Sequence, residues 1–282
     1  EKTKALEAYQ EAGEDPKALE CIPMLKRSDI KREAAKIINE ELTVDDSLFL
    51  YHDVCTNGIG YVDLMFKTDS IAPEQIPYLG LLKSVLGYVD TENYTYGELF
   101  NEINANTGGI NCGVEVFDRA DSTEEFQAMF SVRGKALYTK MDFLFKMIGE
   151  ILNSSKLEDT KRLYEIVASV KSRAQVNLTG AGHSTAVLRA AAYSSPMAAF
   201  QDEMAGIGYY QFIEKLEKDF EQRKEETVEE LCKLMKKILR PENFMISYTG
   251  ERESLETVQK LAGAVKAGLG TEPVEKSEEK LT

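Results

Sequence analysis

The sequence predicts an α+β fold, in which a mostly antiparallel sheet of five or six strands carries helices packed on one face. Three observations lead to this prediction. Several segments alternate apolar and polar residues with a period of two, as half-buried strands do. The middle third of the chain instead repeats apolar residues at helical spacing. The predicted strands follow one another through short turns or long connections, which is typical of antiparallel sheets with segregated helices.

The first two predicted strands flank a turn signal. Leu48–Cys55 and Ile59–Lys67 both alternate, and Asn57-Gly58 stands between them. Because both residues of that dipeptide tolerate a positive φ, the pattern predicts a β-hairpin. The second strand has one apolar face and one mixed face, formed by Val62, Leu64 and Phe66 and by Tyr61, Asp63 and Met65 respectively.

Three more strands are predicted further along the chain. Thr107-Gly108-Gly109 opens Ile110–Phe117, and its glycines fit a helix C-cap that leads into a strand better than a ligand contact. Glu125–Arg133 and Asn243–Thr249 repeat the alternation of apolar and polar residues. Together with the first pair, they supply most of the expected sheet.

Helices are predicted between the strands and through the middle third. A capping box, Thr95-Tyr96-Gly97-Glu98, begins one of them, and Pro241 follows the end of another. Further helices are broken at Ser195-Pro196 and at Gly206–Gly208. The predicted helices span, in chain order, Ile76–Val89, Thr95–Ala105, Tyr138–Leu152, Leu163–Leu178, Ser184–Tyr193, Val228–Leu239 and Ser254–Leu269.

Composition excludes several classes of protein. The 282 residues are 43% hydrophobic, so the chain can bury a core as one large or two small domains. A net charge of −14 without a basic stripe argues against nucleic acid and against an anionic membrane surface as partners. The cysteines lack the close spacing of metal sites and predict buried free thiols in a reducing cytoplasm; they are Cys21, Cys55, Cys112 and Cys232.

No catalytic constellation stands out. Hydrolytic zinc normally takes three protein ligands, but the chain has two histidines, His52 in a predicted strand and His183 after a glycine-rich turn. Ser194-Ser195-Pro196 lacks the nucleophile elbow, and Gly180-Ala181-Gly182 lacks the phosphate-loop pattern. We therefore predict no catalytic, no cofactor-binding and no metal-binding residue in this chain.

Two features have alternative interpretations. His183 is expected to begin a helix or to cap a carbonyl, with contact to a substrate as the alternative. One group of aromatic side chains is expected in the core, with contact to a peptide as the alternative. The group consists of Tyr193, Phe200, Tyr209, Tyr210 and Phe212.

Four short words occur in a telling order: Cys21-Ile22-Pro23-Met24-Leu25, Ser28-Asp29-Ile30, Thr107-Gly108-Gly109 and Gly182-His183. With the layout above, they resemble the presequence-protease branch of the pitrilysin/insulinase (M16) metallopeptidases over about residues 20–269. In that family four α+β domains follow one another, and only the first carries the zinc motif His-x-x-Glu-His. Here the corresponding helix reads Leu79-Gly80-Leu81-Leu82-Lys83-Ser84-Val85-Leu86, without a metal ligand. The resemblance implies the third, non-catalytic domain.

This resemblance sets the expected domain limits. Residues 1–25 would be the end of a helical linker, residues 26–270 the M16-like α+β domain, and residues 271–282 a linker tail. The chain begins at Glu1 without a methionine, which fits a segment of a longer protein. The implied partners are the catalytic half of the same polypeptide and an unfolded peptide substrate.

The implied function is structural. The domain would form part of the wall of a peptide-enclosing chamber in a zinc-dependent oligopeptidase and would dock against the catalytic half. Zinc is expected in the first domain of the full-length protein, and this segment is expected to be inactive alone. The alternative is a free-standing, non-catalytic interaction subunit of the same fold. A zinc-motif domain encoded in frame upstream of Glu1 favours the first hypothesis, and a start codon there favours the second.

Overall fold

The computed structural model describes residues 1–13, 15–34, 36–122 and 125–274. The chain divides into two units, Glu1–Ile37 and Ile38–Thr282. The first unit contains short helices without a buried residue: α1 (Lys2–Glu11), α2 (Pro16–Leu19) and the 3-10 helix η1 (Arg27–Asp29).

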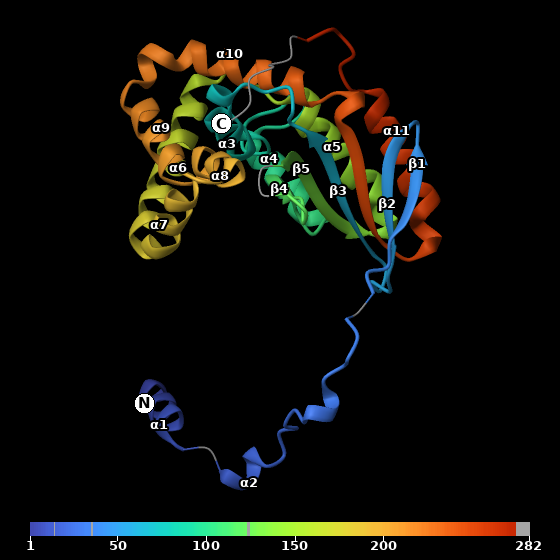
Figure 1. The fold of residues 1–282 in the computed structure, drawn as a ribbon, viewed down its shortest axis with the longest axis vertical. Helices are drawn as coiled ribbons and strands as arrows, with labels where there is room; N and C mark the ends of the chain where they lie inside the picture. The colour runs from blue at the N-terminus through green and yellow to red at the C-terminus, as the bar shows by residue number, and fades with distance from the viewer. Residues whose placement is uncertain (14, 35, 123–124, 275–282) are drawn as a thin grey trace. The chain divides into compact units, whose positions relative to one another are not determined.

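The second unit is built around one six-stranded sheet, drawn in Figure 1. The strands are β1 (Glu40–Val44), β2 (Ser47–Asp53), β3 (Ile59–Lys67), β4 (Ile110–Asp118), β5 (Phe126–Leu137) and β6 (Phe244–Gly250). Their order in space is β1-β2-β6-β3-β5-β4, and every neighbouring pair is antiparallel except β2 and β6. The predicted α+β fold with a mostly antiparallel sheet is confirmed.

The predicted hairpin at Asn57-Gly58 is wrong. Both residues do have a positive φ, of 53° and 81°, so the local turn geometry is as expected. However, β2 and β3 do not pair, because β6 from the far end of the chain lies between them. The tight hairpin instead joins β1 to β2 through Asp45 and Asp46, whose φ values are 46° and 64°.

The loop between β2 and β3 is fixed by the residue that follows β6. The Glu251 carboxylate accepts hydrogen bonds from the backbone N–H groups of Thr56 and Asn57, at 3.0 and 3.1 Å. It also accepts from the hydroxyls of Thr56 and Tyr138. Burial opposes ionisation of Glu251, but the hydrogen bonds from Thr56 prevail and lower its pKa. The loop thus spans the width of one inserted strand and stays ordered.

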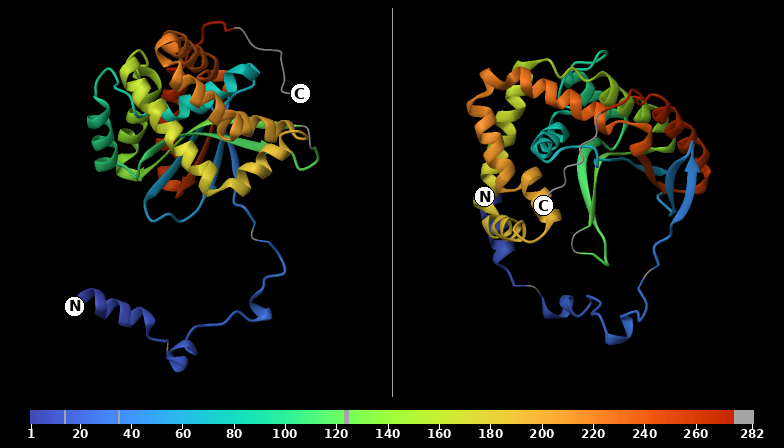
Figure 2. Two further views of the ribbon diagram at one scale, coloured as in Figure 1. Left: turned by 90° about the vertical axis from the view of Figure 1, so that its left-hand side faces the viewer. Right: turned by 45° about the horizontal axis from the view of Figure 1, so that its top comes forward.

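Nine α-helices of the second unit fall in the described part of the chain. They are α3 (Ile76–Val85), α4 (Tyr96–Asn106), α5 (Met141–Ser154), α6 (Thr160–Gly180), α7 (Gly182–Ala191), α8 (Pro196–Ala205), α9 (Ile207–Lys218), α10 (Phe220–Ile238) and α11 (Leu255–Ala267). The 3-10 turns are η2 (Pro73–Gln75), η3 (Tyr138–Lys140), η4 (Pro241–Asn243) and η5 (Arg252–Ser254). Figure 2 shows α6–α10 gathered with α3 beyond the β4 side of the sheet, whereas α11 lies at the β1–β2 side.

One face of the sheet is covered by helices and forms the core. Leu64 and Phe66 of β3 are fully buried there, together with Leu79 of α3 and Leu144 of α5. The alternation predicted for β3 therefore gives the correct inward face. The other face, which we call the open face, carries Tyr61 and Asp63, as well as the odd-numbered residues of β4 and β5.

A sharp corner joins α8 to α9. The side chain of Asp202 is 1% exposed and accepts hydrogen bonds from the N–H groups of Ile207 and Gly208, at 3.0 and 3.1 Å. Arg189 of α7 donates to the same carboxylate at 2.6 Å. A Cβ at Gly206 would collide with Asp202, so the glycine that interrupts the helical pattern leaves space for the carboxylate.

Candidate functional site

Neither histidine belongs to a metal site in the described residues. The ring of His52 lies between two structural partners, with Nδ1 at 2.7 Å from the Ile38 carbonyl and Nε2 at 3.2 Å from Ser247 Oγ. His183 is exposed in the first turn of α7, where the sequence placed a helix start. Within residues 1–274, apart from the four internal positions without a described placement, no group of three His, Cys, Asp or Glu side chains could hold a metal ion.

The cysteines offer no activated nucleophile. Burial raises the pKa of the Cys112 thiol to about 12, and burial likewise raises the pKa of Cys232. Cys21 and Cys55 are exposed, so the expectation that all four thiols are buried is wrong for these two, whereas all four are free.

The helix in which the resemblance places the lost zinc motif is filled by core packing. Leu79 and Leu82 of α3 are buried. A Cβ at Gly80 would lie 2.5 Å from the Met204 carbonyl oxygen and 2.7 Å from the Tyr209 ring, so α3 touches α8 and α9 directly. Lys83 remains half-buried; burial lowers its pKa, and the charge of Glu115 on β4 acts in the opposite direction.

The aromatic group is split by the structure. Phe200 and Tyr209 are buried, which agrees with the core interpretation. Tyr210 is half-buried and donates to Glu214 at 2.7 Å, whereas Tyr193 is 81% exposed beside Arg189. Only part of the stripe is therefore core.

A charged ladder crosses the open face. Arg133 of β5 lies between Asp63 of β3 and Glu115 of β4, with N···O distances of 2.7 and 3.1 Å. Burial raises the pKa of Asp63, although the hydrogen bond and the charge of Arg133 oppose this. One Asp63 oxygen, Oδ1, and the hydroxyl of the 1% exposed Ser131 are buried without a hydrogen-bond partner in the described residues. This face is polar at its centre and incompletely satisfied.

A cavity of about 370 Å3 lies at one end of the ladder. Gly108 and Gly109 form one side of it, next to Tyr61 and Lys135, whose Nζ is 6.0 Å from the Tyr61 ring centroid. Gly109 has a φ of +103°, and its N–H donates to Thr107 Oγ1 at 3.0 Å. The two glycines thus serve the helix-to-strand transition and also border the largest opening on this face.

Removal of Arg133 tests whether the ladder is a coupled unit. Arg133→Met is expected to lower the free energy of unfolding by about 1–2 kcal/mol near neutral pH, because it leaves the Asp63 carboxylate half-buried and unpaired. The folded-state pKa of Asp63 would rise further above its unfolded value. Protonation of Asp63 then stabilises the fold at low pH, and this stability is lost as the pH rises through the folded pKa. Urea unfolding at about pH 4 and pH 7 measures the difference.

The matched control is Lys135→Met on the same strand and face. Lys135 contacts the Tyr61 ring rather than a carboxylate, so the effect of this change is expected to be nearly independent of pH. An Arg133→Met loss of equal size at both pH values would show that Arg133 contributes packing alone.

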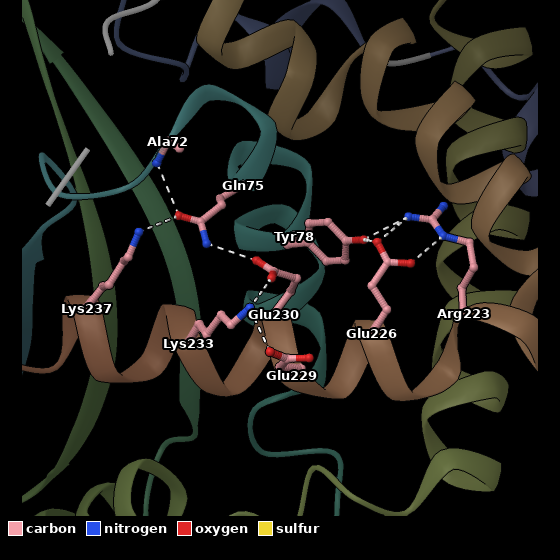
Figure 3. Close-up of polar contacts among 9 residues, drawn as sticks. All are labelled: Ala72, Gln75, Tyr78, Arg223, Glu226, Glu229, Glu230, Lys233 and Lys237. Carbon is pink, nitrogen blue, oxygen red and sulfur yellow. Dashed lines mark hydrogen bonds and ion pairs between the residues drawn. The ribbon is translucent and has the colours of Figure 1, made fainter. Parts of the chain in front are cut away.

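A second polar site holds the start of α3 against α10, as Figure 3 shows. Gln75 donates to Glu230 at 2.9 Å and accepts from Lys237 at 3.0 Å. The Tyr78 hydroxyl accepts from Arg223 at 2.9 Å and donates to Glu226 at 3.3 Å. Burial raises the pKa of Tyr78, so the phenol stays protonated. Because the groups in this groove of about 790 Å3 are bonded mainly to one another, we assign the network to helix anchoring.

The candidate sites were not readable from the sequence as sites. Asp63 and Arg133 stood in predicted strands, but their pairing depends on the register of β3 against β5. Glu115 joins them through the register of β4. A charged residue on an otherwise apolar strand was the available signal, although it does not name the partner.

Comparison with known proteins identifies the family. The model of the family of domains associated with peptidase M16, subfamily C, matches residues 1–216. Protein HypA of Clostridium perfringens is 36% identical over 253 residues, which are 90% of this chain and 26% of that protein. Presequence protease 1, chloroplastic/mitochondrial, of Arabidopsis thaliana is 27% identical over 258 residues, which are 92% of this chain and 24% of that protein. The chain spans about a quarter of the length of these relatives.

Solved structures share the fold. The crystal structure of a peptidase M16 inactive domain from Pseudomonas fluorescens superimposes with a TM-score of 0.56 at 15% identity, covering 86% of this chain and 54% of that one. A conserved protein from Enterococcus faecalis superimposes with a TM-score of 0.58 at 13% identity, covering 80% and 52%. In the described residues no helix is both long and apolar enough to cross a membrane. The chain belongs to the family associated with peptidase M16, subfamily C, as a non-catalytic domain of that type.

Proposed function

We propose that this domain forms part of the wall of a peptide-enclosing chamber in a longer zinc-dependent oligopeptidase, and that it docks there against the catalytic half. The observation that carries the proposal is the packing of α3. The helix that bears zinc ligands in the catalytic domain of the resembling family has Leu79 and Leu82 in the core here. This packing gives the domain a structural use of a helix that serves catalysis elsewhere.

The proposal assigns the open face to the chamber. Helices cover the other face, so Tyr61, Asp63 and Arg133 belong to the surface that an enclosed peptide can reach. The names of the relatives support a peptide as substrate, because several are presequence proteases about four times as long as this chain. The expected zinc belongs to the first domain of that longer protein. The domain limits expected from the sequence and a cytoplasmic location stay predictions.

Metal and activity measurements test the non-catalytic role. The purified chain, dialysed against zinc and then against buffer, is expected to hold far less than one zinc per chain. It is also expected to leave an unstructured peptide intact under conditions in which the longer protein cleaves it. Elemental analysis and mass spectrometry of the peptide provide the readouts. Stoichiometric zinc with peptide cleavage by the isolated chain would overturn the proposal.

Photo-crosslinking in the longer protein tests the chamber wall. Tyr61 on the open face is 42% exposed, and Tyr164 on α6 is 43% exposed, so the two tyrosines form a matched pair. Tyr61→benzoylphenylalanine is expected to crosslink to an unfolded peptide, and Tyr164→benzoylphenylalanine is expected to give little product. Equal labelling from both positions would contradict the assignment of the open face.

A further inference from the structure

The two edges of the sheet differ in how they are protected. Strand β1 at one edge has five residues, two of them glutamates, and it contacts α11. Strand β4 at the other edge has nine residues, INCGVEVFD, with neither proline nor lysine. Edge strands are usually kept from pairing by shortness, charge or covering elements. By these criteria β1 is protected and β4 is not.

The hydrogen-bond pattern shows which backbone groups of β4 point outward. Arg119 N–H donates to the Glu125 carbonyl at 3.3 Å, one step beyond the last registered pair, Asp118 and Phe126. In an antiparallel ladder, hydrogen-bonded and non-hydrogen-bonded pairs alternate. The odd-numbered residues of β4 therefore bond to β5. The N–H and C=O groups of the even-numbered residues face away from the sheet.

The pairing of β5 with β3 leads to the same assignment. Thr68 N–H donates to the Ala128 carbonyl at 3.2 Å, so even-numbered residues of β5 bond to β3 and odd-numbered ones remain for β4. No hydrogen bond from another described element reaches the outward groups of β4. They belong to Ile110, Cys112, Val114 and Val116.

An apolar pocket of about 70 Å3 adjoins the beginning of this edge. Tyr88 and Phe100 at this pocket are 50% and 59% exposed, which is unusual for two neighbouring aromatic rings. The pocket is bounded mainly by Leu86, Tyr88, Phe100, Ile103, Ile110 and Cys112. An edge that offers backbone hydrogen bonds beside a side-chain pocket is the arrangement by which proteins bind extended peptides as an added strand.

We propose that the free edge of β4 binds one extended peptide strand, with an aliphatic or aromatic side chain of that strand in the pocket at Tyr88 and Phe100. The peptide as ligand class rests on the proposed function; the place and mode of binding are new. A single strand fits this edge better than a second folded copy, because α3 and α8 contact β4 and would meet the partner's whole sheet.

Amide hydrogen exchange by NMR tests this mode of binding residue by residue. The probe is a terminally blocked, unstructured peptide of about ten residues in which leucine alternates with threonine, long enough to span β4. At saturation, the N–H groups of Cys112, Val114 and Val116 are expected to exchange at least about tenfold more slowly. Those of Gly113 and Glu115, already bonded to β5, are expected to change little.

Matched variants and a modified probe complete the test. Val114→Pro removes an outward N–H and is expected to weaken binding at least about tenfold, whereas Val114→Ala keeps it and should bind nearly as the parent. Thr43→Pro on β1 controls for a proline at the other edge. If Val114→Pro fails to fold, the same peptide N-methylated at alternate residues replaces it and is expected to lose binding. Phe100→Ala is expected to weaken the leucine peptide more than one with serine in place of leucine.

Several results would overturn the inference. One is slower exchange at odd- and even-numbered residues alike, and another is slower exchange along β1 only. Protection of β4 without peptide, together with a dimer in sedimentation analysis, would assign the edge to a second copy. These failures would leave the zinc and cleavage results of the proposed function as they are, and zinc binding by this chain would not alter the exchange pattern.

Discussion

Asp202→Ala is expected to lower the free energy of unfolding by about 3 kcal/mol, the largest loss for a single polar side chain in this fold. The substitution leaves the N–H groups of Ile207 and Gly208 without their acceptor at the start of α9. It also removes the charge partner of Arg189. Because the Arg189 side chain is 38% exposed and can turn to water, the loss should fall at the low end for broken buried ion pairs. Urea unfolding monitored by circular dichroism measures it.

The control for this prediction is Glu214→Ala on the neighbouring helix. Glu214 accepts one exposed hydrogen bond from Tyr210, so its removal is expected to change stability by no more than about 0.5 kcal/mol. Asp202→Asn keeps one acceptor oxygen and should fall between the two. If Asp202→Ala and Glu214→Ala cost the same, the α8–α9 corner is not held by the carboxylate.

Gly80→Ala is expected to destabilise the protein by about 2 kcal/mol, although alanine is the better helix former. Helix propensity favours the substitution by about 1 kcal/mol. Against this, the new methyl group would overlap the Met204 carbonyl oxygen, which belongs to the backbone and cannot rotate away. Overpacking of this kind costs about 1–3 kcal/mol, and forcing α3 away from α8 lies at the upper end.

Gly149→Ala in α5 is the matched control. A Cβ there meets its nearest neighbour, Asn153 Nδ2, at 4.0 Å, so only the propensity gain remains. This variant is expected to be more stable than the parent by up to about 1 kcal/mol, and thermal unfolding of both variants should show shifts of opposite sign. A stabilised Gly80→Ala would mean that α3 and α8 move apart at little cost.

Local patterns predicted elements well and neighbours poorly. The alternation in Ile59–Lys67 gave β3 with its limits and its inward face. The positive φ of Asn57 and Gly58 was also correct, yet the strands beside them do not touch. A turn signal describes the chain over a few residues, whereas the choice of neighbour was decided by β6, which lies far along the sequence.

The candidate sites required the tertiary structure for the same reason. The Asp63–Arg133–Glu115 ladder joins three strands through two registers, and no spacing along the chain encodes it. The outward groups of β4 follow from one hydrogen bond at Arg119, since a shift of the ladder by one residue would exchange inward and outward positions. By contrast, the capping box at Thr95 is local, and the structure contains it as predicted.

The position of β6 also bears on how the chain is made. A ribosome releases β2 and β3 long before Phe244, on the order of ten seconds at ordinary elongation rates. Throughout that interval the nascent polypeptide holds an unfilled slot with two unpaired borders, each able to recruit a foreign strand. Premature termination ahead of Phe244 should therefore yield aggregating product rather than a smaller soluble domain, and trigger factors or related chaperones would be needed most during this delay.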